Sequence, residues 1–298
     1  MNIVFCINQL GLEGLGSTLI SLLRNCSNSS EITFWFLCSE MTAEDKKNIT
    51  TLLSIEKFNG QSNFIDFDAK KSFGHLRSLH GDWTTYGKLL IPQKINGETA
   101  LYLDSDLIIK LDILTLKNIK FNGELLGAVY GGHIEKALTH NFFIQKLNWH
   151  PETGNFNAGV LVFNIKTWKE MNIDFTWPSL ALKYSNYFLD ADQTLLNLLC
   201  KGNFLHLQSH FNSIWFPNAI NPFTEEENAI FHLVGSPKPW DITGSLLNSG
   251  FKIWKKYDDD FWKSKYNKIT INKLKRTWNI RKSIARHFVS KFIYRKIN

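Results

Sequence analysis

The sequence contains few cysteines and no apolar run long enough to cross a membrane. A membrane-spanning helix needs about 20 consecutive apolar residues, and no run approaches that length. Residues 1–7 have no basic lead and no cleavage site, so we expect a first strand there rather than a signal peptide. The four cysteines are far apart and form no Cys-x-x-Cys pair, which argues against a zinc site and a disulfide framework. We therefore expect a protein of the reducing cytoplasm.

Acidic residues are absent from residues 261–298, which carry twelve lysines and arginines. The formal net charge of the chain is +7, so subtracting these twelve charges leaves residues 1–260 at −5. The basic excess therefore belongs to the C-terminal segment alone. This asymmetry predicts a mildly acidic body, residues 1–260, followed by a basic tail, residues 261–298.

Apolar residues recur in the tail at a spacing of three to four, with basic residues between them. The apolar set is Ile280, Ile284, Ala285, Phe288, Val289, Phe292, Ile293 and Ile297; the basic set is Arg281, Lys282, Arg286, Lys291, Arg295 and Lys296. This spacing predicts a basic amphipathic helix, which suits an anionic membrane surface. The alternative is a helix that packs on the body with a solvated basic face. Nucleic acid is not expected as a partner, because the acidic body offers it no supporting surface.

Strand and helix patterns alternate through the first part of the chain. Strands are expected at residues 2–7, 32–38 and 63–67, and helices at residues 15–25 and 42–56. Residues 42–45, Thr-Ala-Glu-Asp, resemble a capping box that opens the second of these helices. This order is typical of an α/β fold with a doubly wound sheet, in which ligands bind at the carboxyl ends of the strands. The first turn, residues 8–16, contains three glycines but no Gly-x-Gly-x-x-Gly, which argues against a dinucleotide site there.

Two carboxylates interrupt a strongly apolar strand pattern at residues 101–110. Asp104 and Asp106 are two positions apart, so an extended chain directs both side chains to the same side. Anions flanked by hydrocarbon are costly unless a positive group compensates them. A magnesium or manganese ion fulfils this requirement, because both prefer oxygen ligands. The alternative is a pair of surface acids at the end of a strand.

Two known motifs contain such an Asp-x-Asp pair. One is the metal-binding motif of nucleotide-sugar transferases, and the other is the nucleophile loop of haloacid-dehalogenase-type phosphatases. The phosphatase motif requires a later apolar strand that ends in a Gly-Asp pair. The later acidic cluster, residues 258–260, follows no such strand. The transferase interpretation is therefore favoured.

Residues 232–240 carry a second group of candidate ligands. Gly235 allows the backbone to approach a ligand closely, and Lys238 supplies a point charge of the kind that binds phosphate. His232, at the end of a predicted strand, is a candidate metal ligand, although an isolated histidine is more often structural. Together with the Asp-x-Asp pair, these residues predict a cation and a lysine that hold a diphosphate.

Two charged residues outside these motifs have simpler explanations. Lys88 lies on a predicted helix, residues 84–92, where a lysine is more often solvated than bound to an anion. Asp190 lies at the start of a predicted helix, residues 189–199, where the helix dipole favours an acid. A capping role for Asp190 is therefore expected.

Four segments together resemble glycosyltransferase family 8. They are residues 101–106, residues 156–164, Asp192-Gln193 with residues 195–197, and His232-x-x-Gly235-x-x-Lys238-Pro-Trp240, in this order. The family comprises retaining, manganese-dependent enzymes of GT-A fold, including bacterial lipooligosaccharide galactosyl- and glucosyltransferases and glycogenin. The resemblance covers residues 2 to about 240. It implies a single Rossmann-like mixed sheet flanked by helices.

The resemblance also implies roles for particular residues. It places Mn²⁺ or Mg²⁺ on Asp104, Asp106 and His232; the donor on Asn8, Lys88, Asp104, Ser105, Asn157, Asp192, Gln193, Gly235 and Lys238; and catalysis on Gln193, Asp192 and Lys238. Retention of configuration allows two routes. Gln193 matches a candidate nucleophile, but an amide oxygen is a poor one. We therefore favour attack on the same face from which the diphosphate leaves.

Several positions depart from the family pattern. Asn8 and Gly11 stand where many members carry Asp and Tyr, and Lys88 stands where Arg is common. Residues 130–132 lack an acid that some members have. These departures leave open an inactive sugar-nucleotide-binding protein. The leading hypothesis is an α-hexosyltransferase that moves galactose or glucose from a UDP-sugar to an oligosaccharide or lipid-linked glycan, such as lipopolysaccharide or capsule, at the inner face of the membrane.

Overall fold

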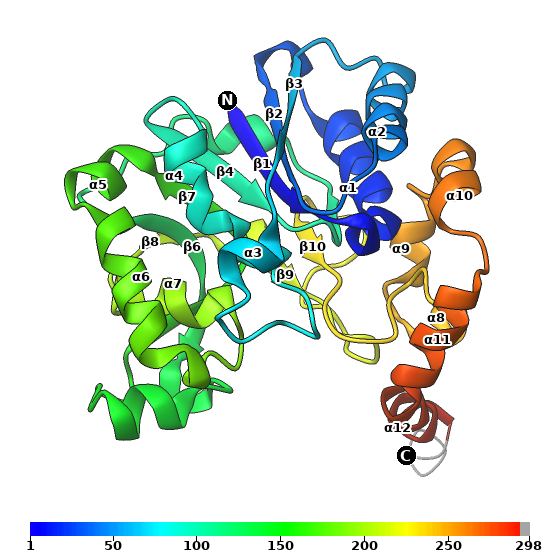
Figure 1. The fold of residues 1–298 in the computed structure, drawn as a ribbon. Helices are drawn as coiled ribbons and strands as arrows, with labels where there is room; N and C mark the ends of the chain where they lie inside the picture. The colour runs from blue at the N-terminus through cyan, green and yellow to red at the C-terminus, as the bar shows by residue number, and fades with distance from the viewer. Residues whose placement is uncertain (293–298) are drawn as a thin grey trace.

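Seven strands form the central sheet in a computed structural model that describes residues 1–292 (Figure 1). Their order is β3-β2-β1-β4-β7-β6-β8. The strands are β1 (Asn2–Ile7), β2 (Thr33–Cys38), β3 (Gln61–Asp66), β4 (Thr99–Leu103), β6 (Leu126–His133), β7 (Gly154–Asn164) and β8 (Leu205–Leu207). Strands β3 to β4 are parallel, whereas β7 runs antiparallel to both β4 and β6. The predicted mixed α/β sheet is therefore confirmed.

Helices cover both faces of this sheet. They are α1 (Leu12–Asn25), α2 (Ala43–Ile55), α3 (Ala69–Phe73), α4 (Ile91–Lys94), α5 (Ile165–Glu170), α6 (Ile173–Tyr184), α7 (Asp192–Cys200), α8 (Gly244–Leu247), α9 (Phe251–Lys255), α10 (Asp260–Tyr266), α11 (Ile271–Asn279) and α12 (Arg281–Phe292). Strand β1 separates the two apolar cores. Ile3 and Phe5 join the core of α1 and α2, while Val4 joins the core of α5 to α7, because alternate residues of a strand point to opposite faces.

Helix α2 begins as its sequence predicts. The hydroxyl of Thr42 accepts a hydrogen bond from the backbone N–H of Asp45 (3.1 Å). The carboxylate of Asp45 accepts one from the backbone N–H of Thr42 (2.9 Å) in return. This reciprocal capping box satisfies two N–H groups that a helix start would otherwise leave unpaired.

A second sheet of three short strands lies at the end of β4. Its strands are β5 (Leu107–Ile109), β10 (Ile230–His232) and β9 (Ser213–Ile214), in the order β5-β10-β9. Strand β10 runs antiparallel to β5, and His232 lies opposite Leu107. The sequence predicted the apolar segments that form β5 and β10, but not the pairing of these two strands. The pairing matters because it brings residues from two distant parts of the chain to one place.

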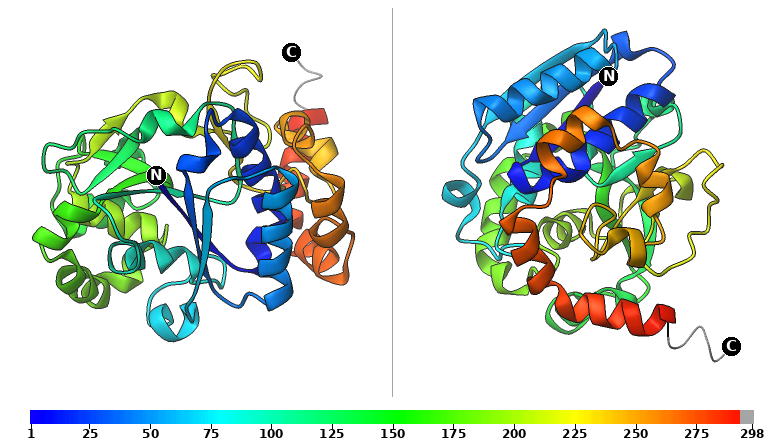
Figure 2. Two further views of the ribbon diagram at one scale, coloured as in Figure 1. Left: turned by 90° about the horizontal axis from the view of Figure 1, so that it is seen from above. Right: turned by 90° about the vertical axis from the view of Figure 1, so that its right-hand side faces the viewer.

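Helix α10 packs against α1 and α2 (Figure 2). The side chain of Trp262 is 1% exposed, and its Nε1 donates a hydrogen bond to the carbonyl of Leu12 (2.7 Å). A Cβ atom at Gly16 would lie 2.2 Å from the Trp262 ring, and one at Gly14 would lie 2.7 Å from the Trp240 ring. Two glycines of α1 thus allow close packing of tryptophans. The predicted boundary after residue 260 falls at the start of α10.

The last helices continue from α10 along the body. On α11, the buried Lys273 donates a hydrogen bond to the carbonyl of Trp240 (3.0 Å) and lies 3.4 Å from the carboxylate of Glu13. Part of the predicted amphipathic helix forms α12. Four of its predicted residues, Ile293, Arg295, Lys296 and Ile297, lie outside the described residues. Among residues 1–292, no helix combines the length and apolarity needed to cross a membrane.

The burial of Trp262 predicts a large loss of stability in Trp262→Ala. Removing a buried tryptophan costs about 3 to 5 kcal/mol of unfolding free energy, because the cavity collapses only partly. Trp278→Ala is the control, since Trp278 is 68% exposed; a change within about 0.5 kcal/mol is expected there. Urea unfolding measures both. Equal stability of the two variants would show that α10 does not belong to the folded core.

Candidate active site

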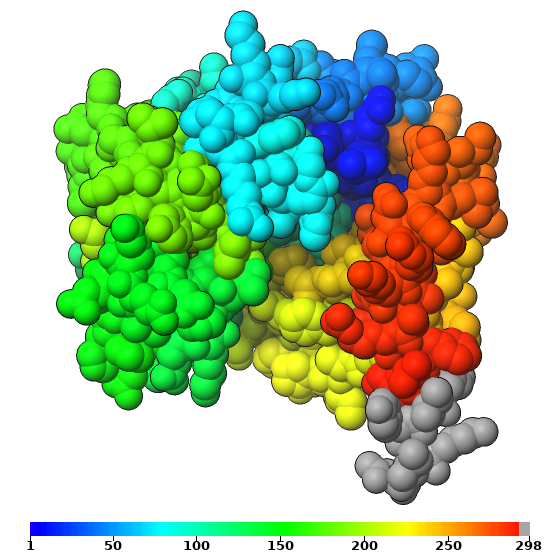
Figure 3. All heavy atoms as spheres, turned by 60° about the horizontal axis from the view of Figure 1, so that its bottom comes forward, coloured from blue at the N-terminus to red at the C-terminus, as the bar shows by residue number. Residues whose placement is uncertain are grey.

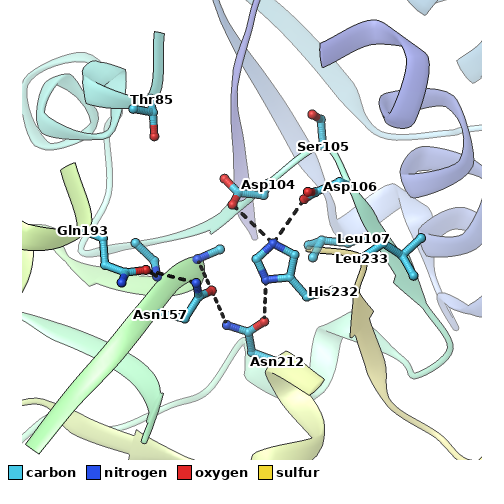
Figure 4. Close-up of polar contacts among 12 residues, drawn as sticks. Thr85, Asp104, Ser105, Asp106, Leu107, Asn157, Gln193, Asn212, His232 and Leu233 are labelled. Carbon is cyan, nitrogen blue, oxygen red and sulfur yellow. Dashed lines mark hydrogen bonds and ion pairs between the residues drawn. The ribbon is translucent and has the colours of Figure 1, made fainter. Parts of the chain in front are cut away.

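Asp104, Asp106 and His232 meet where the two sheets join (Figure 4). Asp104 follows β4, Asp106 precedes β5 and His232 ends β10. The Nε2 atom of His232 lies 3.2 Å from Oδ1 of Asp106 and 3.6 Å from Oδ2 of Asp104. One ligand atom from each residue lies within 4.8 Å of the other two. Three side chains that were predicted to share a metal therefore point at one position.

These three side chains fit a divalent cation. Oδ1 of Asp106 is buried and has no hydrogen-bond partner, although buried polar atoms are nearly always paired. Burial alone would raise the pKa of Asp106, but the ammonium of Lys238 and His232 outweigh burial and lower the pKa well below its usual range. The carboxylate is therefore ionised. Two carboxylates and an imidazole form a donor set that divalent metals accept.

Lys88 is buried between two acids. Its Nζ atom lies 2.6 Å from Oδ2 of Asp192 and 3.6 Å from Oδ1 of Asp104, and its side chain is 3% exposed. Burial alone would lower the pKa of Lys88, but Asp104 and Asp192 outweigh it and raise the pKa. The expectation of a solvated lysine is therefore wrong. Thr85 donates a second hydrogen bond to Asp192, so this carboxylate is held on both oxygens.

Helix α7 presents Asp192 and Gln193 at its first turn. The residue before the helix is Ala191, whose φ is 47°, and no side chain caps the helix. The capping role expected for Asp190 is therefore wrong, and Asp190 instead lines the cavity described below. Burial, and then the charge of Asp192, raise the pKa of Asp190.

A row of three amide side chains extends from His232 to α7 (Figure 4). Nδ1 of His232 lies 3.0 Å from Oδ1 of Asn212, and Nδ2 of Asn212 lies 3.0 Å from Oδ1 of Asn157. Asn157 then donates to Oε1 of Gln193 (3.0 Å). Asn212 was not predicted as a site residue, because it lies in a short 3₁₀ turn, Ser209–Asn212, whose sequence contains no recognisable motif.

A cavity of about 380 Å³ connects these groups, and Figure 3 shows the hollow between the cyan, yellow and red segments. Nine of the eleven predicted site residues line it. They are Lys88, Asp104, Asp106, Asn157, Asp192, Gln193, His232, Gly235 and Lys238. The other two do not line it: Asn8 donates hydrogen bonds to Asp82 and Thr84, and Ser105 points away from His232 (Figure 4).

Arg276 of α11 also lines the cavity, although it lies in the predicted tail. Its Nε and Nη2 atoms bind the two carboxylate oxygens of Asp241 at 2.6 and 3.2 Å. Asp241 also accepts a hydrogen bond from the backbone N–H of Lys238 (2.7 Å). Helix α11 is thus attached to the loop that carries Lys238. The sequence did not predict this contact, because nothing in it distinguishes Arg276 from the other basic residues of the tail.

A family profile described as Glycosyl transferase family 8 matches residues 2–244. The chain belongs to glycosyltransferase family 8. The predicted resemblance is thereby confirmed. As a member of this family, the protein is a glycosyltransferase. The family 8 fold usually binds a divalent metal, which agrees with the acidic cluster described above.

Curated relatives of this family 8 chain include bacterial transferases. It is 24% identical to a lipopolysaccharide 1,3-galactosyltransferase of Salmonella typhimurium, over 82% of this chain and 74% of the relative. It is also 24% identical to general stress protein A of Bacillus subtilis, over 81% of this chain and 87% of the relative.

Solved structures show the same GT-A fold. The galactosyltransferase LgtC, in complex with donor and acceptor sugar analogs, superposes with a TM-score of 0.72 at 22% identity, covering 91% of this chain and 98% of that one. The glycosyltransferase GlyE of Streptococcus pneumoniae gives a TM-score of 0.63 at 19% identity, covering 88% and 62%.

The buried ion pair predicts a pH-dependent loss of stability in Lys88→Met. Removing one partner of a buried pair costs about 3 to 5 kcal/mol, because Asp192 would remain charged and unpaired. Without Lys88, burial holds the folded pKa of Asp192 above its unfolded value of about 3.9. The penalty is therefore small below the unfolded pKa, grows as the pH rises, and levels off above the folded pKa.

Urea unfolding from about pH 4 to 8 measures this dependence. The double variant Lys88→Met/Asp192→Asn is the control, since it has no charge at either position and should lose less stability at neutral pH. A penalty for Lys88→Met that does not change with pH would contradict the assigned ion pair.

Proposed function

We propose that this family 8 glycosyltransferase is a retaining α-hexosyltransferase that moves galactose or glucose from a UDP-sugar to a surface glycan such as lipopolysaccharide or capsule. The observation that carries this proposal is the convergence of Asp104, Asp106 and His232 on the cavity that contains Gln193 and Lys238. The lipopolysaccharide galactosyltransferase relative supports this choice of sugar and acceptor.

The proposed metal ligands are Asp104, Asp106 and His232, holding Mn²⁺ or Mg²⁺. When bound, the cation neutralises charge on the donor's diphosphate as the sugar leaves. The chain supplies two further cations on the same side of the cavity. Lys238, now 2.6 Å from Asp106, is the proposed diphosphate ligand, with the backbone of Gly235 beside it. Arg276, whose Nε and Nη2 are held by Asp241, lines the cavity with them and adds a positive charge.

Attack on the leaving-group face is the route we favour for retention. The Oε1 atom of Gln193 accepts hydrogen bonds from Nδ2 of Asn157 (3.0 Å) and from the backbone N–H of Ala158 (3.1 Å). Both bonds draw electron density from an oxygen that is already a poor nucleophile. In the favoured route, the acceptor hydroxyl attacks the anomeric carbon as the diphosphate leaves, and a diphosphate oxygen takes the hydroxyl proton. Asp192 and the Gln193 amide then stabilise the cationic sugar.

Donor turnover with an acceptor library tests the proposed activity. UDP-galactose and UDP-glucose are incubated with Mn²⁺, the protein and oligosaccharide acceptors, and UDP release and the product linkage are measured. Turnover with an α-linked product is expected, and EDTA or Asp106→Asn should abolish it while the melting temperature stays close to wild type.

Two other outcomes would contradict parts of this proposal. Donor binding without turnover on any acceptor would favour the inactive sugar-nucleotide-binding alternative, which the departures at Asn8 and Lys88 prompted. Full turnover in EDTA, or in Asp106→Asn, would exclude the metal assignment while leaving the transferase activity in place.

We further propose that the C-terminal helices hold the enzyme on the inner, anionic face of the membrane, where lipid-linked acceptors lie. Helix α11 exposes Ile271, Leu274 and Trp278 on one side, while Lys273 and Arg276 contact the body. Basic residues of the tail add about 1 kcal/mol each near an anionic surface, within roughly a Debye length of 8 to 10 Å. A truncation would remove both sides of α11, so point variants are the better test.

Leu274→Glu/Trp278→Glu should weaken binding to vesicles that contain phosphatidylglycerol, while turnover on soluble acceptors stays unchanged. Sedimentation measures binding, which should also fall as salt rises. Phe175→Glu/Leu182→Glu on α6 is the matched control, because both residues are exposed but lie outside the basic tail. If the wild-type protein does not bind these vesicles at low salt, the membrane assignment is wrong.

A further inference from the structure

Asn212 lies buried between the candidate metal site and the residues assigned to the donor sugar. It is 5% exposed, and it contacts His232 on one side and Asn157 on the other (Figure 4). Both of its side-chain polar atoms are therefore used within the site. The directions of these hydrogen bonds are not free, because the backbone of β7 fixes them.

Two backbone N–H groups of β7 set the orientation of the first two amides. The N–H of Gly159 donates to Oδ1 of Asn157 (3.0 Å), and the N–H of Ala158 donates to Oε1 of Gln193 (3.1 Å). A backbone N–H can only donate, so an oxygen must face each of them. The Nδ2 group of Asn157 then faces Gln193, and its oxygen faces Asn212.

The same reasoning fixes Asn212 and then His232. Because an oxygen of Asn157 faces Asn212, the NH₂ group of Asn212 must point there, and its oxygen must point at Nδ1 of His232. An amide oxygen only accepts hydrogen bonds, so Nδ1 of His232 carries a hydrogen. Only Nε2 is left to offer a lone pair, and Nε2 is the atom that faces Asp104 and Asp106.

Gly159 restrains the same histidine ring from a second direction. A Cβ atom at this position would lie 2.2 Å from Cε1 of His232, so the ring lies directly against the backbone of β7. The ring is thus held by packing at Gly159 and by one hydrogen bond, which Nδ1–H of His232 donates to Oδ1 of Asn212. That hydrogen bond is its link to Asn157 and Gln193.

We propose that Asn212 is a positioning residue with two separable tasks. Its oxygen holds His232 with Nε2 directed at the cation, and its NH₂ group holds Asn157 and, through it, Gln193 against the donor sugar. This inference rests on the proposed metal site at Asp104, Asp106 and His232. Partners that orient a metal-bound histidine typically change metal affinity or activity 10- to 100-fold when removed.

Two substitutions at Asn212 separate the two tasks. Asn212→Asp keeps an oxygen for Nδ1–H of His232 but has no N–H for Asn157, whereas Asn212→Ala loses both. Mn²⁺ affinity is measured by electron paramagnetic resonance without donor or acceptor, and turnover is measured at saturating Mn²⁺ and UDP-sugar. We expect about a 10- to 100-fold loss of Mn²⁺ affinity in Asn212→Ala. Asn212→Asp should keep an affinity close to wild type but still lose turnover by a similar factor.

Asn164→Ala is the matched control. Asn164 is also buried, caps α5 by accepting from the N–H of Thr167, and donates to the carbonyl of Glu124. It should lower the melting temperature while leaving Mn²⁺ affinity unchanged. A general loss of stability is thereby distinguished from a positioning effect.

Three results would overturn this proposal. Mn²⁺ affinity could fall equally in the aspartate and alanine variants, both could keep wild-type affinity and turnover, or the control could lose as much Mn²⁺ affinity as Asn212→Ala. Failure of wild-type protein to bind Mn²⁺ is a different result, because it removes the proposed metal site itself.

Discussion

The antiparallel pairing of β5 with β10 is the constraint on which the site depends. It places His232 opposite Leu107, the residue next to Asp106. Asp104 joins them because β4 ends one residue before it and continues the same chain segment. If β10 shifted by one residue along β5, the imidazole would point to the opposite face of the small sheet, because side chains alternate along a strand. The relative positions of the proposed metal ligands therefore depend on the register of the three residue pairs that join β5 and β10.

Charge compensation is the second organising feature of the site. Asp104, Asp106 and Asp192 all line the cavity, where burial penalises the charges of Asp106 and Asp192. Lys88 balances the charges of Asp192 and Asp104, and Lys238, in the loop after β10, balances the charge of Asp106. A ligand that brings both a cation and a diphosphate can replace the contact between Lys238 and Asp106. These ion pairs thus hold the charged groups of the site in place.

The C-terminal segment packs against the body on one side and is exposed on the other. Its uniformly basic sequence did not distinguish these two sides. Trp262 of α10 belongs to the core of α1 and α2, and α11 joins the donor side of the cavity through Lys273 and Arg276. Its exposed apolar side is the part proposed to contact a membrane. Helix α11 contacts the loop that carries Lys238 on one side and solvent on the other. The basic segment therefore contains both buried and exposed residues.

Local patterns in the sequence determined the α/β class, the capping box of α2 and the candidate ligands Asp104, Asp106, His232 and Lys238. These features depend on residues that are close together in the chain, or on motifs whose order along the chain can be read from the sequence. Only the tertiary structure decided that Lys88 is buried, that Asp190 is not a cap and that Asn212 and Arg276 belong to the site. Each of those facts depends on which distant segment packs against the residue, and a residue's own neighbours in sequence do not encode that contact. Burial then sets the charge state and the hydrogen-bond partners, so the chemistry of these positions follows from the fold.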